Sequence, residues 1–170
     1  ASRGAPNGRA QQSLLRASLG DGGMRASELS CAEAHGTGTA LGDPIEAGSL
    51  VAAVLAVRGE VPLAVGGVKA NIGHAEPAAG MTGLLKLAIG LQRGEAAPNA
   101  QLRSLNPHVG DSMRGAACAL LVQLAATVKE QEATRGGVSS FGYSGTIAHA
   151  VLSCGSGGED AESCSALPPL

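Results

Sequence analysis

Residues 33–39 read Glu-Ala-His-Gly-Thr-Gly-Thr, and residues 69–74 read Lys-Ala-Asn-Ile-Gly-His. In each segment a histidine follows an apolar run and stands beside glycines, a pattern typical of a strand that ends in a turn. Ligands of α/β folds bind where the strands end. His35 and His74 are therefore the first candidates for functional residues.

The segments around these motifs alternate between strand and helix patterns. Residues 29–34 and 63–68 are short apolar runs, which predict two buried strands. A helix is predicted from Asp43, as its N-cap, to about Arg58, and a second one from Pro77 to about Arg93. Their expected buried stripes are Ala47, Leu50, Val51, Val54 and Leu55 on the first, and Met81, Leu84, Leu85 and Ala88 on the second.

A shorter helix after Asn7 precedes the first strand, and the order of strands and helices predicts a layered α/β architecture. Residues 116–122, 137–141 and 148–153 look like three further strands, for which we expect a meandering antiparallel edge. We assign residues 1–154 to one domain. Residues 155–170, rich in Gly, Ser and Pro, are expected to form a flexible tail.

The composition excludes several functional classes. Twelve basic and fourteen acidic residues give a net charge of −2 without a basic cluster, so a nucleic-acid partner is not expected. No apolar stretch has membrane-spanning length and no secretory signal is present, which favours a soluble, intracellular protein. The four cysteines form no C-x-x-C pair, so no metal site is expected. A cofactor-binding module is disfavoured because neither G-x-G-x-x-G nor a P-loop occurs.

Three long blocks carry a family resemblance. They are EAHGTGTALGDPIEA at 33–47, VGGVKANIGHAEPAAGMTGLLK at 65–86 and GVSSFGYSGTIAHAVL at 137–152. In this order they resemble the C-terminal half of a β-ketoacyl synthase of the type I polyketide synthase branch. APNGRAQQ at 5–12 and PNAQLRSLNPHV at 98–109 extend the resemblance over most of the chain.

The resemblance implies the second half of a thiolase-like fold, with a layered mixed β-sheet packed by helices. It also implies an acyltransferase activity: decarboxylative Claisen condensation of an acyl thioester with a malonyl-type extender, in polyketide or fatty acid biosynthesis. The family's nucleophilic cysteine belongs to a Thr-Ala-Cys-Ser-Ser type motif in the first half, and no such motif occurs here. The chain alone is therefore expected to be inactive.

The resemblance also assigns roles to individual residues. His35 and His74 match the paired histidines that stabilise the enolate, and Lys69 matches a lysine expected to hold His74 in position. Thr37 and Thr39 match threonines that bind the phosphopantetheine arm of the substrate, although such hydroxyls often cap only their own turn. The resemblance also places Phe141 and Gly142 in the substrate-binding set, and Phe141 matches the phenylalanine that gates the acyl pocket. Ile147 departs from the family's usual asparagine, whereas His108 and His149 are expected to be structural.

The implied partners are an acyl carrier protein and the missing N-terminal half, and the complete domain is expected to form a homodimer. No cofactor is expected to bind directly. The alternative interpretation is a non-catalytic relative that pairs with an active synthase, as chain-length-factor subunits do. The resemblance leaves open the acyl length, the extender unit, the pathway and the compartment, whether cytoplasm or plastid.

Overall fold

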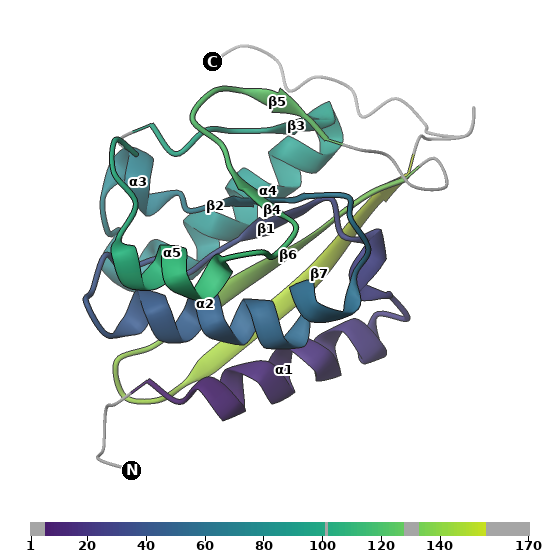
Figure 1. The fold of residues 1–170 in the computed structure, drawn as a ribbon. Helices are drawn as coiled ribbons and strands as arrows, with labels where there is room; N and C mark the ends of the chain where they lie inside the picture. The colour runs from purple at the N-terminus through teal and green to yellow at the C-terminus, as the bar shows by residue number, and fades with distance from the viewer. Residues whose placement is uncertain (1–5, 101, 128–132, 156–170) are drawn as a thin grey trace.

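A five-stranded sheet forms the centre of the molecule in a computed structural model that describes residues 6–100, 102–127 and 133–155 (Figure 1). The strand order is β4-β2-β1-β6-β7, and the first four strands are mutually parallel while β7 runs antiparallel to β6. The strands are β1 Cys31–Glu33, β2 Leu63–Gly66, β4 Cys118–Leu120, β6 Ala133–Phe141 and β7 Ile147–Gly155. A two-stranded antiparallel sheet joins β3 Glu95–Ala96 to β5 Ala125–Ala126.

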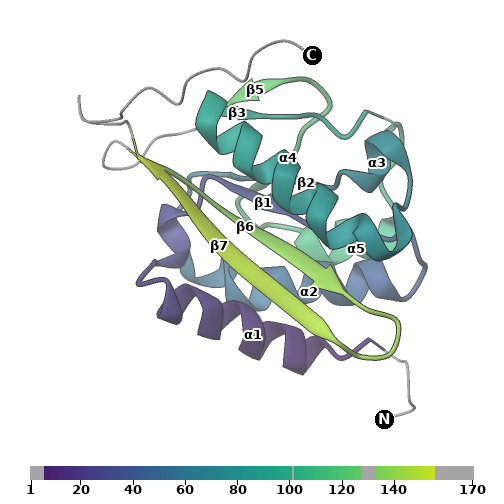
Figure 2. The same ribbon diagram turned by 180° about the vertical axis from the view of Figure 1, so that it is seen from behind.

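Helices cover both faces of the large sheet (Figures 1 and 2). Helices α1 (Gly8–Asp21) and α2 (Gly42–Ala53) lie on one face, with α5 (Pro107–Met113) packed against α2, and α4 (Ala79–Arg93) lies on the other. Short helices complete the chain: α3 Lys69–Ile72 and the 3₁₀ turns Ala26–Glu28, Leu55–Val57 and Glu76–Ala78. The layered α/β architecture predicted from the sequence is confirmed.

Each face has its own apolar core. Leu63 and Val54 are almost fully inaccessible in the core beneath α1 and α2, where Leu15 of α1 also packs. The core beneath α4 is smaller and contains Leu87 and Val138. Small residues let these layers approach closely, and Gly136 shows how closely: a Cβ there would lie 2.7 Å from Leu87 Cδ1.

Three expectations about individual elements were wrong. Helix α2 ends at Ala53 rather than near Arg58, because a 3₁₀ turn follows it. On α4 the buried residues are Ala79, Gly83, Leu87 and Leu91, whereas Met81 and Leu85 of the expected stripe are 58% and 54% exposed. Strand β4 pairs in parallel with β2 at the opposite edge from β7, so the three C-terminal strands do not form one meander.

Strand β7 ends the described part of the chain at Gly155, and the rest of the tail expected for 155–170 lies outside the described residues. Asn7 caps α1 as predicted, since its Oδ1 accepts a hydrogen bond from the backbone N–H of Ala10 at 3.2 Å. Within the described residues, no helix combines the length and apolar character needed to cross a membrane.

Candidate active site

Three parallel strands end at the same edge of the sheet and deliver the candidate residues there. His35 follows β1, Lys69 follows β2, and Phe141 is the last residue of β6. The His35 ring lies 5.9 Å, centroid to centroid, from that of His74 in a T-shaped arrangement, and 5.6 Å from the Phe141 ring. The structure therefore gathers both histidines and Phe141 at the carboxyl ends of the strands, where α/β folds bind ligands.

Glu46 holds the backbone at His35, a contact that sequence reasoning missed. Its carboxylate accepts the backbone N–H of His35 at 2.7 Å and that of Gly36 at 2.9 Å. Burial raises the pKa of Glu46, and the two backbone hydrogen bonds act in the opposite direction. The sequence places Glu46 at the start of a predicted helix, and that position alone indicates only a helix-start residue.

Lys69 contacts His35 rather than His74, which corrects the expectation from the resemblance. Its ammonium Nζ donates to the backbone carbonyl of His35 and lies 3.4 Å from Nδ1 of the same residue. The His35 side chain is buried, and this burial, followed by the charges of Lys69 and His74, lowers its pKa from 6.5 to about 4. His35 is therefore neutral at physiological pH.

His74 is exposed and fixed by the turn that follows it. The backbone N–H of Glu76 donates to His74 Nδ1 at 2.9 Å. Glu76 has a φ of 49°, a left-handed conformation that costs a residue with a side chain about 1–2 kcal/mol. The strained residue thus places a donor on the histidine ring.

The Thr-Gly-Thr turn is tied to the start of α2. The Thr37 hydroxyl donates to Asp43 Oδ1 at 3.4 Å, and the Thr39 hydroxyl accepts the backbone N–H of Gly42 at 3.0 Å. Asp43 does not cap α2, since Leu41 occupies the N-cap position; the carboxylate instead accepts the Gly38 N–H at 3.1 Å. Of the two threonines, Thr37 lines the adjoining cavity, whereas the Thr39 hydroxyl is hydrogen-bonded within the turn.

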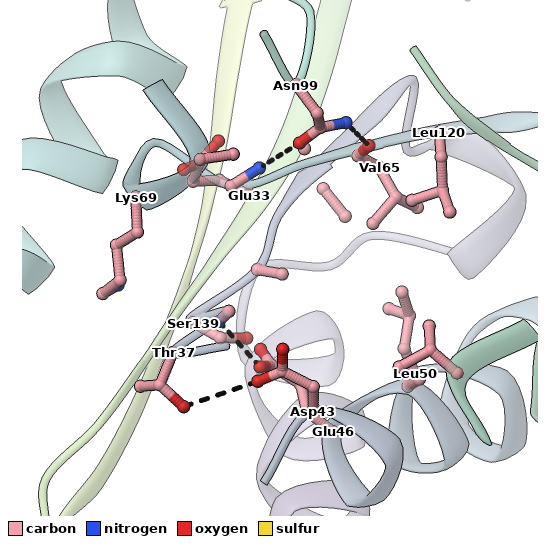
Figure 3. Close-up of a pocket in the computed structure, with 18 of the residues that line it drawn as sticks. Glu33, Thr37, Asp43, Glu46, Leu50, Val65, Lys69, Asn99, Leu120 and Ser139 are labelled. Carbon is pink, nitrogen blue, oxygen red and sulfur yellow. Dashed lines mark hydrogen bonds between the residues drawn. The ribbon is translucent and has the colours of Figure 1, made fainter. Parts of the chain in front are cut away.

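A cavity of about 490 Å³ extends from this edge between the sheet and α2 (Figure 3). Lys69, His74 and Phe141 line it together with apolar side chains, including Leu50, Val65 and Leu120. This volume is typical of a site for a small organic molecule. Asp43 and Glu46 lie on one side of it in Figure 3, with Lys69 and Asn99 on the other.

Two polar residues that the sequence analysis did not single out brace the strand ends. Asn99 Oδ1 accepts the Gly67 N–H at 3.0 Å, and its Nδ2 donates to the Val65 carbonyl at 3.2 Å. The buried Glu33 carboxylate accepts the Val68 N–H and pairs with Lys86 Nζ at 2.6 Å. Asn99 and Glu33 thus fix the segment that leads from β2 to Lys69. They are far from this segment in the sequence, and only the fold places them beside it.

Phe141 and Gly142 begin the hairpin between β6 and β7. The Gly142 N–H donates to the Thr146 carbonyl at 2.6 Å, closing a turn whose tip carries the exposed Tyr143. Ile147 is the first residue of β7 and pairs with Phe141 across the hairpin. Phe141 thus stands at the junction of rigid strand and turn, whereas Gly142 lies on the turn and does not line the described cavity.

Comparisons with known proteins identify the family. Residues 1–103 match the family model described as the C-terminal domain of beta-ketoacyl synthase. The chain belongs to the β-ketoacyl synthase family. It is 44% identical over 156 residues to a phenolphthiocerol/phthiocerol polyketide synthase of Mycobacterium tuberculosis, covering 89% of this chain and 8% of that protein. It is 42% identical over 148 residues to the erythronolide synthase EryA2 of Saccharopolyspora erythraea, covering 87% and 4%.

Solved structures of ketosynthases share the fold of this chain. An oxazolomycin ketosynthase domain of Streptomyces albus matches with a TM-score of 0.82 at 34% identity, covering 89% of this chain and 27% of that one. Ketosynthase twelve of the bacillaene polyketide synthase of Bacillus amyloliquefaciens gives 0.81 at 33% identity, covering 90% and 27%. The predicted resemblance and fold class are confirmed, and the chain spans about a quarter of each solved ketosynthase chain.

Two of the described cysteines, Cys31 and Cys118, are poor nucleophiles. Cys31 is buried on the α4 side of the sheet, where burial raises its pKa to about 11. Burial also raises the pKa of Cys118, on β4. Neither thiol forms a thiolate readily at neutral pH. Among the described residues, no three His, Cys, Asp or Glu side chains are placed to hold a metal ion.

Proposed function

We propose that this chain supplies the enolate-stabilising half of a ketosynthase active site, in a polyketide synthase whose nucleophilic cysteine lies in the rest of the domain. The single observation that supports this most strongly is the pairing of His35 and His74, whose ring centroids lie 5.9 Å apart, beside a cavity that His74 lines. The roles of Lys69, Thr37, Thr39, Phe141 and Gly142 belong to this proposal.

The hydrogen bonds at the two imidazole rings favour one tautomer of each. His74 Nδ1 accepts a backbone N–H, so its proton resides on Nε2. His35 Nδ1 faces the ammonium of Lys69, which has only protons to offer, so the proton of this neutral ring also resides on Nε2. Two Nε2–H donors are then available to one thioester oxygen.

The proposed reaction begins with the loss of carbon dioxide from a malonyl thioester. The bond to the carboxylate breaks, and its electron pair passes into an enolate whose oxygen receives the two N–H hydrogen bonds. The enolate carbon then attacks the acyl carbonyl on the cysteine, a carbon–carbon bond forms, and the cysteine thiolate departs. Donors held in fixed positions are effective for such charge development, because they need no reorganisation during the reaction.

The electrostatics at His35 suit this role. Burial, and after it the charge of Lys69, keeps the pKa of His35 low and the ring neutral. The ring therefore donates through one nitrogen and accepts from Lys69 through the other. Glu46 fixes its backbone through the His35 N–H. Lys69 is therefore proposed as a positioning residue for His35.

The substrate is proposed to arrive on the phosphopantetheine arm of an acyl carrier protein, past Thr37 at the cavity wall. Thr39 and Gly42 are hydrogen-bonded to one another, so Thr39 would contribute to the arm only through its turn. Phe141, whose ring lies against His35, is proposed to gate the acyl side of the cavity. The complete domain is proposed to be a homodimer.

The test uses the complete ketosynthase domain that contains this sequence. Replacing His35 or His74 with alanine is expected to reduce malonyl decarboxylation about 10²- to 10³-fold, the usual cost of losing one charge-stabilising donor, while acyl loading on cysteine persists. His108→Ala on the surface of α5 is the matched control and should have no effect. Decarboxylation at the parental rate in both active-site variants would favour the alternative of a non-catalytic partner of an active synthase.

A further inference from the structure

The helix that carries Lys69 is too short to be stable by itself. Helix α3 has four residues, of which Lys69 is the first, and His74 follows two residues after its end. None of these four described residues is buried, so packing does not anchor the helix. A single helical turn is unstable in isolation, because ordering its backbone costs more than its few hydrogen bonds contribute. The positions of both catalytic candidates therefore depend on polar contacts that tie α3 to the sheet.

The Asn99 side chain fixes the end of β2. Its Nδ2 donates to the Val65 carbonyl at 3.2 Å, and its Oδ1 accepts the Gly67 N–H at 3.0 Å (Figure 3). These two groups flank Gly66, and a residue of a neighbouring parallel strand would bind the same pair. Nδ2 also donates to the Leu121 carbonyl at 3.2 Å, and Asn99 is only 8% exposed. The amide thus continues the hydrogen bonding of β2 one step beyond its last pair with β4, which is at Val65.

The Asn71 side chain, on α3, forms the same kind of pairing with the segment that carries Asn99. Its Nδ2 donates to the Pro98 carbonyl at 3.0 Å, and its Oδ1 accepts the Ala100 N–H at 2.9 Å. These two groups flank Asn99. Each carboxamide uses both a donor and an acceptor, which neither an aspartate nor a leucine could offer. Asn71 and Asn99 together, here called the asparagine clamp, therefore link α3 to the end of β2 through residues 98–100.

We propose that the asparagine clamp positions Lys69 and His74 against His35. Gly67 lies before Lys69 and Asn71 lies after it, so the clamp holds the chain on both sides of the lysine. The Lys69 ammonium is thereby directed at the backbone carbonyl of His35, and the turn that follows α3 brings the two histidine rings together. This inference rests on the proposed ketosynthase function and adds to it two positioning residues.

Both residues of the clamp are uncharged, so the clamp acts by placement alone. The pKa of His35 is lowered first by burial and then by the charges of Lys69 and His74. Releasing α3 lets both of these groups move away from the ring, which weakens their effect. The pKa of His35 should therefore rise in a clamp variant, although the substitution removes no charge.

The experiment replaces Asn71 with alanine in the complete domain. Asn71 is exposed in this chain, so the variant is expected to fold. Malonyl decarboxylation should fall about 10- to 100-fold, because small displacements of catalytic groups are costly, while acyl loading on cysteine persists. Nuclear magnetic resonance of the domain with ¹⁵N-labelled histidine should show a raised pKa of His35. Asn99→Ala should reduce decarboxylation at least as much, and the double variant no further, since both residues act on one turn.

Asn7→Ala is the matched control. Asn7 also accepts a backbone N–H through Oδ1, at the start of α1, and it lies outside the described lining of the cavity. Its replacement should lower the melting temperature to an extent comparable with Asn71→Ala. It should leave both malonyl decarboxylation and the pKa of His35 unchanged.

An unchanged pKa of His35 in Asn71→Ala would overturn the clamp, and so would decarboxylation at the parental rate. Equal losses of activity in Asn71→Ala and Asn7→Ala would also overturn it, because they would show an effect of stability alone. The pKa measurement needs no turnover, so the clamp is tested separately from the reaction. Parental decarboxylation by both His35→Ala and His74→Ala would refute the proposed function, whatever the clamp variants show.

Discussion

The contact between Lys69 and His35 predicts a specific change in titration. Replacing Lys69 with methionine, in the complete domain, removes the ammonium that lies 3.4 Å from His35 Nδ1. That charge disfavours a second positive charge on the ring, so its loss must raise the pKa of His35. The lysine stem is retained in large part by methionine, which limits the loss of packing.

The size of the change follows from the separation and from the total shift. Two unit charges about 4 Å apart interact by about 1 kcal/mol in water and about 4 kcal/mol near a protein surface. The larger value alone would lower a pKa by about 3. That exceeds the whole fall from 6.5 to about 4, of which burial is the largest cause. The weaker limit therefore applies, and we expect the pKa of His35 to rise by about 0.7 to 1 in the variant.

Nuclear magnetic resonance of the domain carrying ¹⁵N-labelled histidine gives the pKa of His35 directly, with His35→Gln used to assign its signal. As the pH falls, the parental ring protonates near pH 4, and the variant ring does so at a higher pH. The acid limb of malonyl decarboxylation should move in the same direction. Lys69→Arg keeps the charge and should leave the pKa low. An unchanged pKa in Lys69→Met, or equal shifts in both variants, would refute a charge effect.

Three further predictions concern the acyl gate, the activity of the isolated chain and the exposed apolar side chains of α4. Phe141→Ala should relax selectivity between short and long acyl donors with less effect on malonyl decarboxylation, and unchanged selectivity in a folded variant would assign the ring to packing. The 170-residue chain alone should form no β-ketoacyl product from loaded carrier proteins, and any turnover would show that a cysteine within it suffices. It should also self-associate through the exposed Met81, Leu85 and Ile89 of α4; replacing them with glutamine should yield monomer in sedimentation, unlike the same change at exposed Val57.

Local sequence patterns were enough to place most elements. The apolar runs before His35 and Lys69 required buried strands, and Asn7 required a helix start, since each depends only on neighbouring residues. The same patterns failed on α4, where every side of the helix carries apolar or small residues. Burial of Gly83 rather than Leu85 follows from the close approach of α4 to the sheet: a Cβ on Gly83 would lie 3.4 Å from Glu33 and Val138.

The candidate site, like the fold, was predicted in part from local sequence patterns and in part only from the tertiary structure. Each histidine could be found from its own motif. The prediction that both lie directly at strand ends holds for His35 and is wrong for His74, because α3 lies between β2 and His74. The partner of Lys69 could not, because α3 turns the lysine back toward β1 and its ammonium reaches His35 across the sheet edge. Glu46, Glu33 and Asn99 act on backbone groups far from them in sequence, and no periodicity records such contacts.

By itself, the sequence determined the family, the order of most strands and helices, and the residue types available for enolate chemistry, because motifs and local propensities are written along the chain. It did not predict α3, α5, β3 or β5. Only the tertiary structure decided which histidine Lys69 contacts and which face of α4 is buried. These are properties of distances between segments far apart in the chain, such as Lys69 and His35, separated by 34 positions. Packing of the parallel strand ends sets those distances, and no local pattern encodes them.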